Sequence, residues 1–134
     1  LASITTQSNN TAIGFNALLA ATASTGNIAI GQSCLAAATG PGDNNTIIGT
    51  SAADSASFSG TNNVGVGFNV MSATTSAGGL VAVGRDALNA VTTGSNNIGI
   101  GALTGTSSGG TGSANVTTGT NNTFIGNAAG GNAA

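Results

Sequence analysis

A short motif recurs along the whole chain, and its spacing restricts the folds that are possible. In each copy a glycine, called here the marker glycine, follows a β-branched residue: Gly14, Gly31, Gly49, Gly67, Gly84, Gly101 and Gly126. The intervals between them are 17, 18, 18, 17, 17 and 25 residues. A nearly constant period of this length is typical of stacked repeats, in which each unit contacts only its neighbours. We therefore predict one repeat domain over residues 1–134, with coils centred on these glycines and a loop insertion at about residues 105–118.

The residues before each marker glycine alternate as they do in strands. The residue directly before it is always β-branched: Ile13, Ile30, Ile48, Val66, Val83, Ile100 and Ile125. Two residues earlier stands another β-branched residue: Thr11, Ile28, Thr46, Val64, Val81, Ile98 and Thr123. The residue between them is usually small, and such alternation predicts a short strand rather than a helix. We expect the β-branched side chains to point inward and the small ones outward.

Asparagine marks a corner of the repeat. It stands four residues before six of the seven marker glycines, at Asn10, Asn27, Asn45, Asn63, Asn97 and Asn122, whereas Leu80 takes the remaining place. A stacked asparagine can bond to the copies above and below, so these residues are expected to form a ladder. The marker glycine then permits a sharp bend. The apolar pair that follows, such as Ala17-Leu18 or Val70-Met71, is predicted to form a second short strand that points inward.

A single repeat cannot be stable alone. It supplies about three or four aliphatic side chains, which do not offset roughly 1–2 kcal/mol of backbone ordering per residue. Stacking the repeats at about 4.8 Å joins these side chains into one continuous core. The sequence therefore predicts an all-β fold, a parallel β-solenoid or β-roll of about seven coils of 17–18 residues. Small outward residues such as Ala12, Ala29 and Gly65 would let a second copy approach closely, so we also expect a homotrimer.

The composition argues against chemistry and against several partners. The charged residues are Asp43, Asp54, Arg85 and Asp86, far fewer than the roughly 25% of residues usual in soluble domains. Acid–base catalysis needs titratable groups in proximity, and no Asp recurs at the repeat period, so we expect no enzyme activity, no catalytic residue, no metal site and no cofactor. One basic residue and four Phe also exclude nucleic acid as a partner. Asp43 and Asp54 are expected to be solvated, and Arg85 and Asp86 to form an exposed ion pair.

Cys34 and the start of the chain bear on the compartment. A single cysteine cannot form an internal disulfide, and Cys34 stands where other repeats have Ala or Val, so we expect a buried apolar residue. The chain has no run of 18 apolar residues, so we expect neither a transmembrane helix nor insertion into a membrane. The chain starts at Leu1, without an initiator Met, which favours a secreted or virion-borne segment. The expected location is extracellular or on the surface of a virion.

The repeat resembles known fibre sequences. Asn9-Asn10-Thr11-Ala12-Ile13-Gly14-Phe15-Asn16-Ala17-Leu18 is similar to the NTAIGxxAL repeats of bacteriophage tail fibres and to the Asn-Ser-x-Ala-Ile-Gly repeats in the head domain of trimeric autotransporter adhesins. The resemblance extends from about residue 9 to residue 130. It implies a homotrimeric parallel β-roll that projects from a virion or bacterial envelope. The Asn, Ile or Val, and Gly positions named above are then structural repeat positions, and none of them is a receptor site.

Three functions follow as hypotheses. The first is a non-enzymatic structural segment of an extracellular or viral fibre, similar to a phage tail fibre, which forms a stiff rod and contacts a host surface. The second is a secreted subunit that polymerises head to tail into an extracellular filament. The third is a surface adhesin head or another binding module, with a receptor or glycan as partner. Ice binding ranks low, because the position of Thr11 holds Ile or Val in four other repeats.

Overall fold

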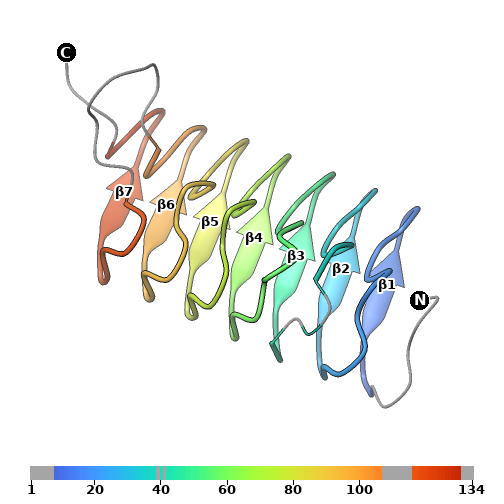
Figure 1. Ribbon diagram of the computed structural model, residues 1–134. Coiled ribbons are helices and arrows are strands. Elements are labelled where there is room, and N and C mark those ends of the chain that lie inside the picture. Colours follow the sequence, from blue (N-terminus) through green and yellow to red (C-terminus); the bar gives the residue numbers. More distant parts are fainter. Residues whose placement is uncertain (1–7, 39, 41, 107–115, 131–134) are drawn as a thin grey trace.

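The protein is a stack of short parallel strands. The computed structural model describes residues 8–38, 40, 42–106 and 116–130. The strands are β1 (Thr11–Ile13), β2 (Ile28–Ile30), β3 (Thr46–Ile48), β4 (Val64–Val66), β5 (Val81–Val83), β6 (Ile98–Ile100) and β7 (Thr123–Ile125). They form one sheet in chain order, each pair parallel, and the connections wind round behind it (Figure 1). No helix occurs in the described residues, and the predicted all-β parallel solenoid is confirmed.

The register of the sheet sets equivalent residues of the repeat side by side. Ile13 pairs with Ile30, and Val83 pairs with Ile100. The same register holds between β6 and β7, although the repeat is longer there. The central part of the insertion predicted in this repeat, Ser107–Ala114, lies outside the described residues.

The marker glycines are required at the bend that follows each strand. Their φ angles lie between +118° and +149°, a region that residues with a Cβ rarely adopt. Space is also lacking: a Cβ on Gly14 would lie 2.5 Å from the carbonyl oxygen of Gly31 and 2.7 Å from its carbonyl carbon. Glycine therefore serves both the backbone conformation and the close approach of adjacent coils.

The segment after each marker glycine is a turn, so the predicted second strand is wrong. The second and fourth residues after the glycine are left-handed, as in Asn16 (φ 59°) and Leu18 (φ 50°). Left-handed residues at alternate positions bend the chain and prevent an extended conformation. Bonds between coils nevertheless continue, because the N–H of Leu18 donates to the carbonyl of Cys34 at 3.0 Å. The inward direction of the apolar pair is as predicted, since Leu18 is fully buried.

The two faces of the strands are reversed from the expectation. In β2 to β6 the middle residue is buried, whereas the flanking β-branched residues are partly or largely exposed. Ala29 and Gly65, expected to point outward, lie in the core, and Ala12 packs against it. These residues therefore cannot be the surface on which a second copy approaches.

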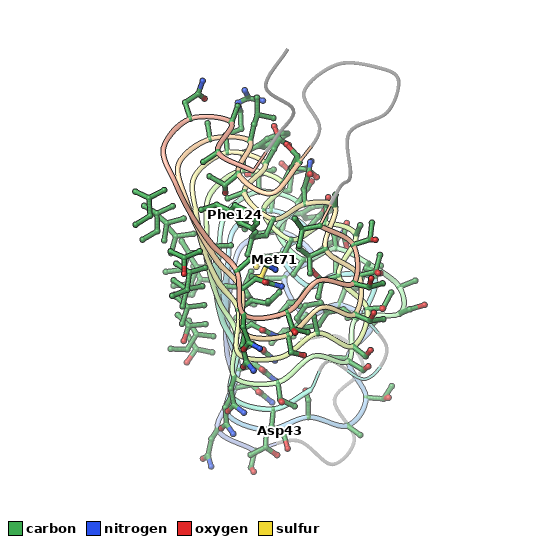
Figure 2. All side chains as sticks on the ribbon, turned by 90° about the vertical axis from the view of Figure 1, so that its left-hand side faces the viewer. Asp43, Met71 and Phe124 are labelled. Atoms are coloured by element: carbon green, nitrogen blue, oxygen red, sulfur yellow. The ribbon has the colours of Figure 1, made fainter. Side chains whose placement is uncertain are left out.

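The interior of the coil is filled by matching large residues with small ones. Gly65 has no side chain, and the methyl end of Met71 occupies the place where a Cβ would lie. In the preceding repeat the sizes are exchanged, because Ile47 points inward from β3 while Ala53 follows in the turn. Figure 2 shows Met71 and Phe124 inside the coil. Such compensation keeps a thin core close-packed, and it explains why the narrow interior takes the small strand residues.

Candidate functional site: the outward face of the sheet

The outward side of the sheet carries two columns of β-branched side chains, called here the sheet face. The first column consists of Thr11, Ile28, Thr46, Val64, Val81, Ile98 and Thr123, and the second of Ile13, Ile30, Ile48, Val66, Val83, Ile100 and Ile125. They form the row of carbon atoms that projects from the strands in Figure 2. Its exposed Val and Ile side chains range from 37% at Val66 to 70% at Ile125, whereas residues such as Ile28 and Ile48 are only partly exposed.

The sheet face is regular, stiff and uncharged. Parallel pairing repeats each column at about 4.8 Å, and the two columns lie about 6.6 Å apart along the strands. Val, Ile and Thr have restricted χ1 rotamers, so the array has little side-chain entropy to lose when something covers it. None of its fourteen residues carries a charge. The face is therefore suited to contact with another flat apolar surface.

The size of the sheet face can be estimated from transfer energies. At about 25 cal/mol per Å², the 1.5–3 kcal/mol for burying an aliphatic side chain corresponds to about 60–120 Å². Eight of the fourteen side chains are exposed and the other six are only partly exposed, so the face presents on the order of 400 Å². Just past the bend, Phe15 and Phe68 are 73% and 54% exposed, and they add about 250 Å². Patches on monomers that reach about 300–600 Å² are often functional.

The predicted asparagine positions lie at one border of the sheet, inside the coil. The Asn27 N–H donates to Oδ1 of Asn10 at 2.8 Å, and the Asn45 N–H donates to Oδ1 of Asn27 at 2.8 Å. The Asn45 side-chain amide also donates to the carbonyls of Gly42 (2.8 Å) and Gly60 (2.9 Å). The amide column thus binds successive coils together and fixes their register.

The asparagine column is interrupted once. Oδ1 of Asn63 accepts the N–H of Leu80 at 2.8 Å, but the Leu80 side chain has no oxygen that could accept the N–H of Asn97. The series resumes one coil later, where Asn97 accepts the N–H of Asn122 at 2.9 Å. Leu80 is nonetheless fully buried, so its side chain replaces an amide inside the coil.

A second set of corner residues was not identified from the sequence. The residue before each ladder position is left-handed: Asn9, Gly26, Asn44, Asn62, Gly79, Asn96 and Asn121. The ladder asparagines themselves are not among the positive-φ residues. The usable signal is that this position contains only Asn or Gly, the two residues that adopt this conformation most readily.

Asp43 and Asp54 hold adjacent coils together. Oδ1 of Asp43 accepts the Thr25 N–H at 2.7 Å, and Oδ1 of Asp54 accepts the Ala37 N–H at 2.8 Å. Both carboxylates therefore bond to the preceding coil, in addition to any contact with water.

Arg85 and Asp86 form the expected ion pair, but only Arg85 is exposed. The side chain of Asp86 is 9% exposed, and its Oδ1 accepts from the Asn69 amide at 2.7 Å. In the described part of the chain, no pocket opens in the surface and no three His, Cys, Asp or Glu residues are grouped as metal ligands.

Cys34 is buried in the core, as expected. Its Sγ donates to the carbonyl of Ile47 at 3.3 Å. Burial is the main cause that raises the pKa of the Cys34 thiol to about 12. The thiol is therefore protonated at neutral pH and poorly reactive.

The predicted repeat residues occupy three separate places. The β-branched residues before the glycines lie on the sheet face, the asparagines form the internal column, and the marker glycines form the bend. Phe15 and Phe68 were not singled out, although their position directly after the bend would have indicated exposure.

Comparison with known proteins supplies no relative. No protein-family model, no curated protein and no solved structure matched the chain. None of the described segments forms a helix of the length and hydrophobicity that crossing a lipid bilayer requires.

Proposed function

We propose that the chain is a non-enzymatic structural segment of an extracellular or viral fibre, similar to a phage tail fibre. One observation carries the proposal: backbone, amide and glycine positions all repeat in register along a single axis. Such a structure resists bending because every coil is bonded to the next along several columns. Its length grows by about 4.8 Å per coil, which is what a rod requires.

The resemblance to fibre repeats adds the biological setting. It favours a location outside the cell or on a virion, an assembly of three copies, and contact with a host surface. The four charged residues are engaged in the coil-to-coil bonds and the ion pair described above. This use of the ionisable groups is consistent with a role in architecture rather than catalysis.

Electron microscopy of the purified chain tests the proposal. Discrete short particles of constant length are expected for a fibre segment. Long unbranched filaments, growing with protein concentration, would instead favour the secreted subunit that polymerises head to tail. Compact particles without axial order, together with substantial α-helix by circular dichroism, would contradict both functions.

A further inference from the structure

Among the described residues, all of the exposed large apolar side chains except Leu19 lie on the sheet face or directly after the bend. Hydroxyl groups follow part of the opposite side: Oγ1 of Thr75 and of Thr92 donates to the carbonyl of the corresponding threonine in the next repeat, at 3.1 and 3.0 Å. Asn62 and Asn96 border one edge of the sheet and are exposed. The apolar side chains are thus concentrated where a partner can cover them.

We propose that the sheet face is the contact surface between copies of this chain, which lie side by side with their axes parallel and their sheet faces directed toward a shared axis. The inference deepens the fibre function proposed above and rests on it for the parallel direction, because the chains of a fibre run the same way. It replaces the contact expected from the sequence, since the small strand residues are buried in the core.

The area and chemistry of the face fit a second copy. With Phe15 and Phe68 it presents on the order of 650 Å², which approaches the roughly 800 Å² that each partner contributes to a standard interface. A face without charge can meet an identical face without repulsion. The same repeat of about 4.8 Å in both copies lets branched side chains of one lie between those of the other along the whole length.

The position of the charges also favours this occupant. Asp43 and Asp54 bond to backbone N–H groups of the coil connections, away from the two columns. Arg85 stands at the border of the sheet face but is paired with Asp86. Copies with a net charge of −2 can therefore associate through the face without bringing unpaired charges together.

Charge substitutions test the surface. Val66→Asp is placed on the sheet face, where the native side chain is 37% exposed, so the coil can fold with the carboxylate in water. Thr93→Asp is the matched control, because Thr93 is exposed on the connection behind the sheet. We expect native mass spectrometry to show a multiple of 12.4 kDa for the wild type and for Thr93→Asp. Val66→Asp should be monomeric or raise the dissociation constant at least tenfold, with an unchanged circular dichroism spectrum.

Cross-linking tests the direction. In a Cys34→Ala background, Ile13→Cys places a thiol at the β1 end of the face. Parallel packing brings this position close to its equivalent in the next copy, so a short bis-maleimide should link Ile13→Cys to itself. Antiparallel packing would instead require Ile13→Cys combined with Ile125→Cys, and cross-linking of that combination alone would overturn the proposal.

The remaining outcomes separate the surface from the fibre role. A wild-type oligomer that Val66→Asp leaves intact would overturn the contact surface while leaving the rod function standing. A folded wild-type monomer at high concentration, or one that binds only to lipid vesicles, would also overturn the surface. Failure of the fibre role is recognised independently, by compact particles without axial order in electron microscopy.

Discussion

Replacing a marker glycine in the middle of the stack should be far more damaging than replacing an equally strained glycine elsewhere. A Cβ on Gly49 (φ +149°) would lie 2.6 Å from the carbonyl carbon of Gly67 and closer still to its oxygen. Ordinary contact begins at 3.4 Å, so the carbonyl carbon would have to move by about 0.8 Å and the closer carbonyl oxygen by more. The bond from the Gly67 N–H to the Ile48 carbonyl, 2.8 Å long, lies in the path of that movement.

The magnitude follows from two contributions. The positive φ costs a residue with a Cβ about 1–2 kcal/mol. Weakening one or two buried hydrogen bonds between coils costs about 1–3 kcal/mol more. Gly49→Ala should therefore lower the free energy of unfolding by about 2–5 kcal/mol.

Two controls isolate the contact between coils. Gly126 (φ +118°) has no atom within 4 Å of the added Cβ, and at Gly79 (φ +69°) the nearest atom is Oδ1 of the exposed Asn96, a side-chain end that can move. Gly126→Ala and Gly79→Ala should each cost only about 1–2 kcal/mol, the backbone contribution alone. Urea unfolding followed by circular dichroism measures all three. Equal losses for Gly49→Ala and Gly79→Ala would refute the close stacking of the bends.

Three further predictions concern the interior. Asn45→Leu should lower the free energy of unfolding by about 2–4 kcal/mol, because it leaves the Asn63 N–H and the Gly42 and Gly60 carbonyls without partners. Leu80→Asn completes the ladder, so it should change stability by less than about 1 kcal/mol. Equal losses for the two variants in urea unfolding would argue against the ladder. Met71→Ala and Gly65→Ala should each lower the free energy of unfolding by about 1–4 kcal/mol. The double variant should lose at least about 1 kcal/mol less than the sum of the two single losses. Additive losses would contradict the matched packing. The pKa of Cys34 is raised from 9.0 to about 12 in the folded state. Between pH 9 and pH 12 the unfolded chain has therefore lost a proton that the folded chain keeps. The free energy of unfolding should fall by about 1.4 kcal/mol per pH unit in this range. Cys34→Ala should remove this part of the alkaline dependence, and an unchanged slope would count against a buried protonated thiol.

The positions of the strands could be predicted from the sequence because the backbone conditions are local. Each marker glycine stands directly after a strand, and the β-branched pair defines its two ends. The asparagine column was expected from the stacking of amides. The bond from the Asn27 N–H to Oδ1 of Asn10 and the bond from the Asn45 N–H to Oδ1 of Asn27 show how it is built.

The inside and outside of the strand could not be assigned from hydrophobicity alone. Larger apolar side chains are usually buried, and this general preference pointed Ile13 and Ile30 inward. The interior of one thin coil has room for few atoms, so the opposite arrangement is adopted. The sequence does contain a usable signal: Asn27 and Ala29 have the same parity along the chain, so a stacked internal asparagine requires the small residue to point inward as well.

The turn after the bend was mispredicted for a similar reason. Val70-Met71 is an apolar pair with good strand propensity, yet the chain is left-handed at Met71 (φ 53°) because the turn must bring both side chains into the core. The matching of Met71 with Gly65, six residues earlier, is a tertiary effect that only comparison between repeats could reveal.

The central claim is that one repeat adds one layer along a straight axis, whatever its length in residues. Spin labels on the exposed left-handed corner test it directly, in a Cys34→Ala background diluted with unlabelled chain. Asn9→Cys paired with Asn96→Cys spans five layers, and Asn9→Cys paired with Asn121→Cys spans six, so the mean distances should be about 24 and 29 Å. Although 25 residues separate Asn96 from Asn121, the two distances should differ by only about one strand spacing. Finding this increment by pulsed electron paramagnetic resonance would support the claim. Distances that do not increase by one layer from Asn96 to Asn121 would contradict it.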